Sequence, residues 1–372
     1  MKVGLLIDDH MARPGGVQEY VRGLGRFLLR HDHEVVIFSS GGPSNAELRL
    51  IRLGSALNLR GSGSSTSIPI TFATRGQLRQ LLEHEACDLL HVMAPYSPTL
   101  SGRLLRQSRA CHVMTFLVAI EPGPYRAVLG TFARLQAATL RRFEARIAIS
   151  ETAAATGRAL YGGSYDIIPC GVDTTRFVPH AAPLPELAAG CANILYVGRL
   201  EQRKGVDHLV RAFARLQRQA PAARLIIAGD GPERRALEQL VAELKLTNVR
   251  FLGYVSSAEL PHVLASGTIF CAPATYAESF GIVLVEALAA GLPIVAAGNA
   301  GYAGLLAAHP GNLVVPPADD RALAGALAAL LDQPAYRQQL GARNRAAAEQ
   351  YSWEQVGQAL LNMYRRLLET QA

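Results

Sequence analysis

One stretch in the last third of the chain allows few local structures. Residues 282 to 289 are apolar except for Glu286, and a second acid, Glu278, lies eight positions before it. Gly281 and Gly291 stand where a helix would begin and end. A glutamate among apolar side chains is costly to bury unless a partner or ligand satisfies it. We therefore predict a short helix whose first N–H groups hold an anion between the two acids.

A surface helix with one solvated glutamate is the alternative interpretation of this stretch. Such a helix needs a polar face, and the residues around Glu286 leave almost none. A buried helix with a ligand at its start accounts better for the pattern.

Short apolar runs alternate with amphipathic segments along the whole chain. Strands are predicted over 2–7, 34–38, 89–93, 111–116, 146–149, 166–168, 193–197, 224–228, 249–255, 268–272 and 293–296. Helices are predicted over 17–28, 125–146, 205–216 and 234–244, and polar loops over 8–16 and 61–67. Alternating strands and helices indicate parallel sheets. A break at 169–173 separates two such series, so we predict two doubly wound α/β domains.

The composition narrows the class of protein. Every apolar run long enough to cross a membrane, about 18 residues, is interrupted by charge or proline, so we expect no transmembrane helix. The five cysteines are scattered and show no spacing typical of a metal site. The N-terminus becomes acidic too early for a signal peptide. We expect a reduced, cytoplasmic protein.

The positive charge is concentrated in the first half. Residues 1–170 hold 19 Lys and Arg against 13 Asp and Glu, a net +6, whereas residues 171–372 hold 18 against 17, a net +1. No aromatic-basic platform or recognition helix accompanies this charge, so we do not expect a nucleic-acid partner. Two interpretations stay open, peripheral contact with an anionic membrane and an ordinary basic surface. A predicted helix carrying Arg75 and Arg79 is the candidate for membrane contact.

Two loops after predicted strands carry groups suited to a phosphate. Gly15 and Gly16 precede the first helix, where backbone N–H groups can approach an anion, with a plain turn as the alternative. Arg199 and Lys204 follow the strand at 193–197, and Lys204 is one of three lysines against 34 arginines. A guanidinium and an ammonium can neutralise a diphosphate leaving group without a metal. No Asp-X-Asp occurs in the chain, so we expect no metal ion.

This set of motifs resembles the GT-B glycosyltransferases, in the large retaining family 4 that includes bacterial phosphatidylinositol mannosyltransferases. Glu278 and Glu286 match that family's E-x7-E motif, and Arg199 with Lys204 matches its diphosphate-binding pair. The remaining matches are the first loop at 14–18, the interdomain crossover at 171–173 and the entry to a last helix at 351–353. The resemblance covers the whole chain and implies two Rossmann-like domains that face a central cleft.

The resemblance also implies a role for each part. Residues 1–170, completed by a helix over 353–372, would bind the acceptor, and residues 171–352 would bind the nucleotide sugar. The implied catalytic residues are Glu278, Arg199 and Lys204. The implied donor-binding residues are Gly16, Val255, Ser279, Phe280, Gly281, Ile282, Val283 and Glu286, and the acceptor-binding residues are Asp9 and Gln18.

The implied reaction is a retaining transfer of a hexose, mannose from GDP-mannose, to a hydroxyl of a lipid or glycan such as a phosphatidylinositol-like acceptor. The nucleotide sugar is a substrate, and no further cofactor is expected. The enzyme would work in the cytoplasm, on the inner face of the cell membrane. Two residues depart from the family: Leu117 follows Thr115-Phe116 where a His is usual, and Cys170 stands where an Asn is usual. Two alternatives stay open: a UDP-sugar-dependent transferase for a polysaccharide or small molecule, and a non-catalytic nucleotide-sugar-binding protein.

Overall fold

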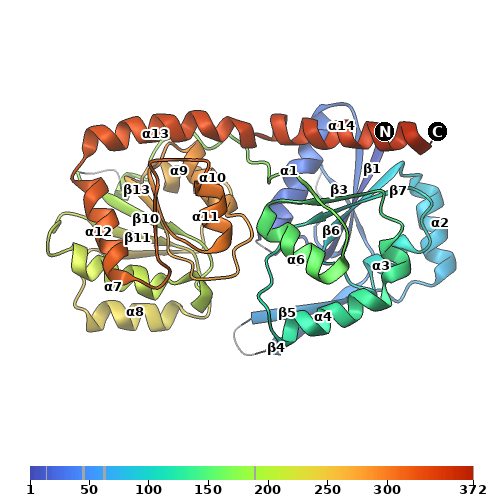
Figure 1. The fold of residues 1–372 in the computed structure, drawn as a ribbon, viewed down its shortest axis with the longest axis horizontal. Helices are drawn as coiled ribbons and strands as arrows, with labels where there is room; N and C mark the ends of the chain where they lie inside the picture. The colour runs from blue at the N-terminus through green and yellow to red at the C-terminus, as the bar shows by residue number, and fades with distance from the viewer. Residues whose placement is uncertain (14, 44–46, 62–63, 188–189, 372) are drawn as a thin grey trace. The chain divides into compact units, whose positions relative to one another are not determined.

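The central strand of the first half is β1 (Lys2–His10), whose apolar residues are buried. The computed structural model drawn in Figure 1 describes residues 1–13, 15–43, 47–61, 64–187 and 190–371. In it, β1 pairs in parallel with β2 (Glu34–Gly41) on one side and β6 (Leu89–Ala94) on the other. Both of these neighbours are apolar and buried too, which is typical of a parallel sheet covered on both faces.

This sheet has seven strands in the order β3-β2-β1-β6-β7-β8-β9, and every pair is parallel. The strands not yet given are β3 (Arg49–Arg52), β7 (Cys111–Phe116), β8 (Ala145–Ala148) and β9 (Asp166–Ile167). The helices of this unit are α1 (Gly16–Arg30), α2 (Arg75–Glu85), α3 (Ser101–Leu105), α4 (Pro124–Leu135), α5 (Ala137–Leu140), α6 (Glu151–Tyr161) and α14 (Trp353–Gln371). They lie on both faces of the sheet (Figure 1).

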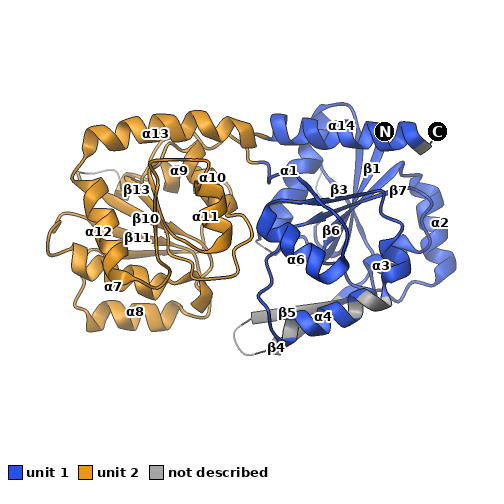
Figure 2. Ribbon diagram, viewed as in Figure 1, with its two compact units in different colours: residues 1–171, 353–372 blue, residues 172–352 orange. Residues whose placement is uncertain are grey.

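The last helix, α14, belongs to the first unit although it comes at the end of the chain. Unit 1 comprises residues 1–171 and 353–372, and unit 2 comprises residues 172–352 (Figure 2). The indole of Trp353 packs edge-on against Tyr20 of α1, with ring centroids 5.5 Å apart. Further along α14, the Tyr364 hydroxyl bonds to buried His91 of β6. These contacts pack α14 against both α1 and strand β6 of the unit 1 sheet.

The second unit is built on a six-stranded sheet in the order β12-β11-β10-β13-β14-β15, again with every pair parallel. Its strands are β10 (Asn193–Val197), β11 (Arg224–Ala228), β12 (Val249–Gly253), β13 (Ile269–Ala272), β14 (Ile294–Ala297) and β15 (Leu313–Val315). Its helices are α7 (Val206–Leu216), α8 (Arg234–Glu243), α9 (Leu260–Ala265), α10 (Ile282–Ala289), α11 (Ala300–Leu306), α12 (Asp320–Leu331) and α13 (Pro334–Ala348). Short 3-10 turns η1 (Pro185–Leu187), η2 (Gln202–Lys204) and η3 (Glu349–Tyr351) join some of them.

Both sheets reverse their strand order at one point. In unit 1 the chain moves outward from β1 to β3 and then returns to pair β6 with the free side of β1. In unit 2 the same reversal lies between β10 and β13. Loops at the carboxyl ends of the strands separate at such a switch point, and ligands bind in the crevice they leave. The prediction of two doubly wound parallel sheets is therefore confirmed.

The structure corrects three predictions in unit 1. The stretch over 61–67, predicted as a polar loop, contributes to two antiparallel strands, β4 (Ser55–Gly61) and β5 (Ser64–Ile70), with residues 62–63 outside the described part. Backbone hydrogen bonds hold such a ribbon, so its polar sequence gave little sign of it. In addition, β1 continues through Asp8 to His10, where a loop was predicted.

The single helix predicted over 125–146 is also wrong. The chain breaks at Gln136, which separates α4 from α5, and Ala145 begins β8. The guanidinium of Arg146 donates to the carbonyls of Leu140, Tyr161 and Gly162, which ties the start of β8 to its neighbours. Tertiary contacts of this kind override the helical period of the sequence.

In unit 2 the strand at 293–296 does not close the series. β15 adds a further parallel strand beside β14, and its three residues are too few to show a period in the sequence. Within the described part of the chain, no helix combines the length and the apolar character needed to cross a membrane.

The contact between α1 and α14 generates a prediction about stability. A Cβ placed on Gly23 would lie 2.2 Å from the indole of Trp353, and the same indole would meet a Cβ on Gly171 at 2.5 Å. Because the ring is confined on both sides, we expect Gly23→Ala to destabilise unit 1 by about 2 kcal/mol or more. Urea or thermal unfolding followed by Trp353 fluorescence measures the change.

Gly130→Ala is the matched control. Gly130 lies within α4, and an added Cβ there meets nothing within 4 Å. Alanine is the better helix former, so this variant should be neutral or more stable by up to about 1 kcal/mol. Equal unfolding midpoints for Gly23→Ala and the wild type would contradict the proposed confinement of the ring.

Candidate functional site

The predicted helix after Gly281 is present as α10. Gly281 precedes it with φ of +94°, a left-handed conformation that L side chains rarely adopt, and an added Cβ would lie 2.8 Å from the ring of Tyr302. Leu284, Val285 and Leu288 of the helix are fully buried, whereas Glu286 is half-buried. The first N–H groups of α10 have no partner within the helix, which suits an anion at this end.

Loops from neighbouring strands of unit 2 meet at the carboxyl edge of its sheet. The N–H of Gly198, after β10, donates to Ala228 at 3.0 Å, and the N–H of Leu200 donates to Asp230 at 3.0 Å. The N–H of Gly229, after β11, donates to the carbonyl of Gly253 at the end of β12 at 2.7 Å. The loops after β10, β11 and β12 therefore form one connected surface, as the strand pattern predicts.

Charged side chains from the loops after β10 and β13 meet across the switch point. Nζ of Lys204 donates to Oε1 of Glu278 at 2.7 Å, and Nη1 of Arg203 donates to the same oxygen at 2.6 Å. The side chain of Glu278 is 10% exposed and that of Lys204 is 16% exposed. A carboxylate this deeply placed needs cationic partners, and the two cations supply them.

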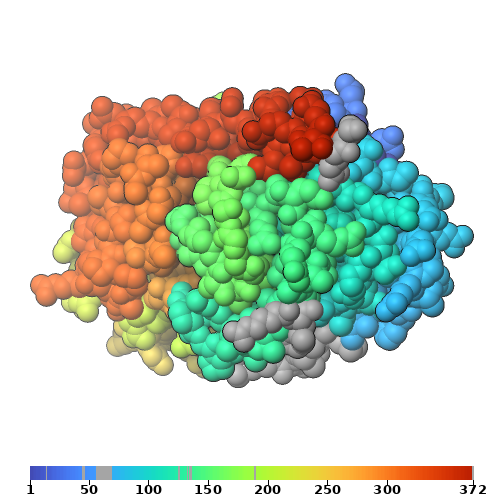
Figure 3. Space-filling model, turned by 45° about the vertical axis from the view of Figure 1, so that its right-hand side comes forward, coloured from blue at the N-terminus to red at the C-terminus, as the bar shows by residue number. Residues whose placement is uncertain are grey.

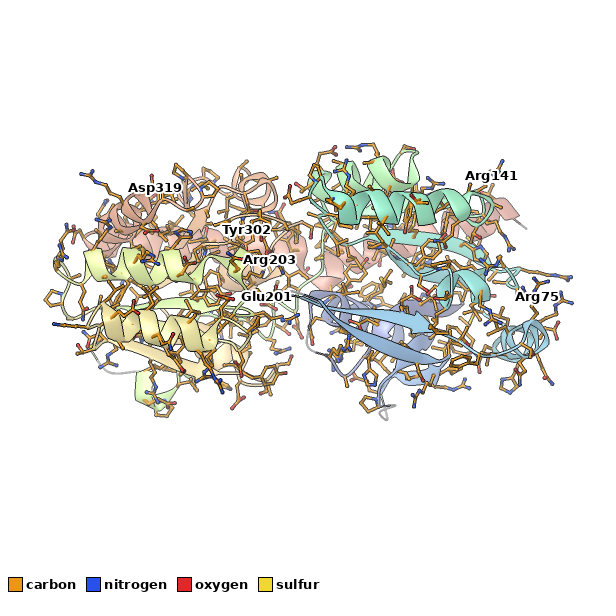
Figure 4. All side chains as sticks on the ribbon, turned by 90° about the horizontal axis from the view of Figure 1, so that it is seen from below. Arg75, Arg141, Glu201, Arg203, Tyr302 and Asp319 are labelled. Carbon is orange, nitrogen blue, oxygen red and sulfur yellow. The ribbon has the colours of Figure 1, made fainter. Side chains whose placement is uncertain are left out.

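A second carboxylate, Glu201, extends this cluster. Its Oε1 lies 3.2 Å from Nη2 of Arg199, and its Oε2 accepts from Nε of Arg203 at 3.0 Å. Arg199 is the exposed member, with 57% of its side chain accessible, so its guanidinium can reach a ligand at the surface. Figure 4 shows Glu201, Arg203 and Tyr302 gathered at one end of unit 2.

Sequence reasoning missed Arg203 and Glu201. The run Glu201-Gln202-Arg203-Lys204 resembles an ordinary charged loop, and the only available signal was its place directly after a buried strand. Burial opposes the charge on Arg203, but the nearby Glu278 and Glu201 carboxylates outweigh it and raise the pKa of Arg203 above its ordinary value. Arg203 is therefore a permanent cation within this cluster.

Two buried tyrosines, Tyr196 and Tyr302, lie beside this charged cluster. Burial, followed by the Glu278 carboxylate, raises the pKa of Tyr302 well above its ordinary value. The same two causes raise the pKa of Tyr196, whose hydroxyl donates to the carbonyl of Arg199 at 2.9 Å. Both hydroxyls therefore keep their protons and act as neutral donors beside the acid.

The other predicted donor residues lie at the same edge of unit 2 or in unit 1. Val255 follows β12 and is half-buried, and Ser279, Ile282 and Val283 are half-buried around the start of α10. Phe280 is 5% exposed, and its ring packs edge-on against Tyr351 at 5.9 Å, so its side chain is a packing element. Gly16 is the first residue of α1 in unit 1.

The predicted acceptor residues Asp9 and Gln18 are in contact within unit 1. Nε2 of Gln18 donates to Oδ2 of Asp9 at 3.0 Å, and Nη1 of Arg13 lies 3.1 Å from Oδ1. Gln18 is 3% exposed, whereas Asp9 is partly accessible. Two partners thus orient the Asp9 carboxylate at the carboxyl end of β1, where it can accept from a hydroxyl group.

The residue beside it, Asp8, was not predicted as a site residue. Its carboxylate spans the unit 1 switch point from β1 to the segment after β6. There it accepts from the N–H of Ser97 in the loop and from the N–H and hydroxyl of Ser101, the first residue of α3. Burial raises the pKa of Asp8 to about 6, although these hydrogen bonds act in the opposite direction. An acid placed directly after a buried strand was the available sequence signal.

Leu117, which stands where a His is usual in the family, is a buried apolar residue. Leu117 is 6% exposed, and its N–H donates to the carbonyl of Ala94 at 3.2 Å. His112 does not replace the missing histidine, because it lies near the amino end of β7 and burial lowers its pKa to about 4. Within the described residues, no group of three or more His, Cys, Asp or Glu side chains is arranged to hold a metal ion.

Comparisons with known proteins agree on one class. A family model described as "Glycosyltransferase Family 4" matches residues 14–176, and one described as "Glycosyl transferases group 1" matches residues 188–347. A phosphatidyl-myo-inositol mannosyltransferase of Mycobacterium tuberculosis is 30% identical over 370 residues, which cover 98% of this chain and 96% of that protein.

Two further proteins are similar over the full length. A GDP-mannose-dependent monoacylated alpha-(1-6)-phosphatidylinositol monomannoside mannosyltransferase of Corynebacterium glutamicum is 28% identical over 389 residues, 97% of each chain. The solved structure of sucrose-phosphate synthase from Thermosynechococcus elongatus superposes with a TM-score of 0.77 over 99% of each chain, at 24% identity. That structural likeness shows that the fold of this chain is GT-B.

Asp8 leads to a prediction about pH. Its pKa in the folded protein, about 6, lies above the ordinary 3.8, so the folded state holds an extra proton between these values. The stability that protonated Asp8 contributes is complete below about pH 4 and is lost as the pH rises through 6, with an upper limit of about 3 kcal/mol. Asp8→Asn does not titrate, so the Tm of the wild type minus that of the variant should fall between pH 4 and pH 7.

Thermal unfolding followed by circular dichroism at steps of pH measures this difference. Asp332→Asn, at an exposed aspartate after α12, is the control whose difference from the wild type should stay flat. A flat difference for Asp8→Asn as well would mean that Asp8 titrates like a surface acid.

Proposed function

The chain belongs to glycosyltransferase family 4, and from that membership we propose that it transfers mannose from GDP-mannose to a hydroxyl of a phosphatidylinositol-like lipid, with retention of configuration and without a metal ion. The single observation that carries the donor half is the Arg199-Lys204-Glu278 arrangement across the unit 2 switch point. The names of the two full-length mannosyltransferase relatives support the choice of donor and acceptor.

In the proposed donor complex, the diphosphate is bound by cations. Arg199 forks onto phosphate oxygens from the exposed side, and Lys204 supplies a compact ammonium. The N–H groups at the start of α10, within Ser279 to Val283, add dipoles of the same sign. These groups stabilise the charge that develops on the diphosphate as it departs, and this is the main catalytic contribution.

The remaining donor groups orient the sugar and the nucleoside. Glu278 accepts hydrogen bonds from the sugar hydroxyls. Glu286, within α10, accepts hydrogen bonds from the ribose. Val255 and its neighbours after β12 receive the base. Positioning of this kind can lower the barrier by several kcal/mol because little orientational freedom is left to lose.

The acceptor hydroxyl is placed by unit 1 in this proposal. Asp9, oriented by Gln18 and Arg13, accepts from a neighbouring hydroxyl of a polyol head group. The reacting hydroxyl oxygen forms a bond to C1 of the sugar while the bond from C1 to the diphosphate oxygen breaks. The hydroxyl proton passes to that departing phosphate oxygen on the same face, so the products are the mannosylated acceptor and GDP.

Peripheral contact with the inner face of the cell membrane forms part of the proposal. Phe72 is 83% exposed, and Arg75 and Arg79 are exposed on the helix that follows it. Arg103 holds the segment before α2 by donating to the carbonyls of Thr71 and Ala73. Figure 3 shows the region of α2, in light blue, on the surface of unit 1, and Figure 4 shows Arg75 projecting outward. An aromatic ring beside two guanidinium groups suits an anionic interface.

The activity itself is tested with purified protein and two donors. Incubation with GDP-mannose and vesicles that contain phosphatidylinositol should release GDP and yield a mannosylated lipid, whereas UDP-glucose should release no UDP. Glu278→Ala should lower kcat by about 100-fold or more with the fold intact. Lys204→Ala should weaken GDP binding by about 10-fold or more, because a charge-assisted contact is lost.

Glu243→Ala, at an exposed glutamate at the end of α8, is the control and should match the wild type. Turnover of UDP-glucose alone would replace the proposed donor. Tight GDP binding without turnover on lipid or glycan acceptors would indicate a nucleotide-sugar-binding protein. Wild-type rates for Glu278→Ala would reject its assigned role.

The membrane contact makes a separate prediction. Replacing both Arg75 and Arg79 by Glu should lower binding to vesicles that contain phosphatidylserine or phosphatidylinositol by about 30-fold or more, because each of the two lost cations contributes about 1 kcal/mol near such a surface. Cosedimentation measures the bound fraction, and neutral phosphatidylcholine vesicles are the reference. Arg211→Glu and Arg218→Glu, at exposed sites in unit 2, serve as the matched control pair. Unaltered binding of the Arg75 and Arg79 variant would remove this surface from the proposal.

A further inference from the structure

Arg203 bridges the two carboxylates of the cluster, and no motif assigns it a task. We propose that Arg203 is a positioning residue. It keeps Glu278 in place for the sugar hydroxyls while Lys204 leaves Glu278 and binds the donor's diphosphate. The inference rests on the proposed function and adds to it the order in which the charges change partners.

Two nitrogens of the Arg203 guanidinium each donate to a different carboxylate. Nε donates to Oε2 of Glu201 at 3.0 Å, and Nη1 donates to Oε1 of Glu278 at 2.6 Å. A planar guanidinium spans two carboxylates in this way, whereas an ammonium acts as a point charge. Glu201 is itself fixed, because its other oxygen faces Arg199 and only 11% of its side chain is exposed.

The backbone of Arg203 joins the same two loops. Its carbonyl accepts from the N–H of Thr275 at 2.9 Å and from the Thr275 hydroxyl at 3.2 Å. Thr275 lies in the segment between β13 and Glu278. The loop after β10 and the loop after β13 are therefore joined at one residue by both main chain and side chain, so that Arg203 cannot move away from Glu278 without breaking several contacts.

Lys204 is held less completely. Its ammonium pairs with the same Oε1 atom that Arg203 already contacts. A diphosphate that binds Lys204 must compete with the Glu278 carboxylate and must also approach the negative charge of that carboxylate. The cluster holds three cations, Arg199, Arg203 and Lys204, against two carboxylates, so it has one positive charge in excess. When Lys204 turns to the diphosphate, Arg203 remains to neutralise Glu278, which is 10% exposed and would otherwise be a buried unpaired charge.

A double-mutant cycle on GDP affinity tests this exchange, measured by isothermal titration calorimetry at fixed pH and salt. Glu278→Gln should tighten GDP binding by about 5-fold, because Lys204 no longer has a competing carboxylate. Arg203→Met should weaken it by about 10-fold, because Glu278 then retains Lys204. In the Glu278→Gln background, Arg203→Met should change GDP affinity by less than about 2-fold, since the carboxylate through which it acts is gone.

Kinetics with the conservative variant test the positioning role. Arg203→Lys keeps the charge but not the fork, so GDP affinity should stay within about 3-fold while kcat at saturating GDP-mannose falls by about 10-fold. Arg211→Met, at an exposed arginine of α7, is the control for both measurements. If Arg203→Met does not fold, Glu201→Gln removes the other anchor of the fork and should likewise lower kcat without weakening GDP binding.

Three results would overturn the inference alone. The first is an equal loss of GDP affinity from Arg203→Met in both backgrounds, because Arg203 would then bind the phosphate directly. The second is unchanged or weaker GDP binding in Glu278→Gln. The third is a wild-type kcat for Arg203→Lys. Should the wild type bind UDP in place of GDP, the same cycle is measured with UDP. A wild-type protein that binds neither nucleotide would reject the proposed function and this inference together.

Discussion

The pairing of Lys204 with Glu278 joins the loops that follow the two strands on either side of the unit 2 switch point, and the proposed donor site depends on it. Parallel strands bring all their carboxyl ends to one edge, so residues 74 positions apart in the chain come within 2.7 Å there. The low exposure of both side chains strengthens their attraction and makes any unpaired charge costly. A site of this kind is stable only while every charge keeps a partner, which is why Arg203 and Glu201 belong to it.

Unit 1 uses the same geometry with a different chemistry. Its switch point is also spanned by a carboxylate, Asp8, but the partners are backbone N–H groups and the hydroxyl of Ser101. Burial raises the pKa of Asp8 because its neutral donors offset the loss of solvation only in part, whereas two cations pair with the acid in unit 2. The same strand order thus provides a cationic edge suited to a diphosphate and a hydroxyl-rich edge suited to a polyol.

Much of the fold was visible in the sequence, because buried parallel strands are continuous apolar runs. The strands at 111–116, 193–197 and 224–228 were predicted with the bounds observed. The errors lie where tertiary contacts decide. The helix predicted over 125–146 is interrupted at Gln136, the β4-β5 ribbon has a polar sequence, and β15 is three residues long. The break at Gln136 goes against the helical period of the sequence. The polar ribbon and the three-residue strand have no period that the sequence alone can reveal.

For the candidate site, the sequence by itself determined which chemical groups follow which strands: two glutamates around a helix start, a Lys and an Arg after β10, and two acids at the end of β1. Family membership follows from the same residues. Only the tertiary structure decided how the charges are paired. Glu278 shares one oxygen between Lys204 and Arg203, and Glu201 binds the Nε atom of Arg203. Both pairings depend on the distances between loops. Electrostatic pairing acts over a few ångströms in space, and position along the chain carries no record of it.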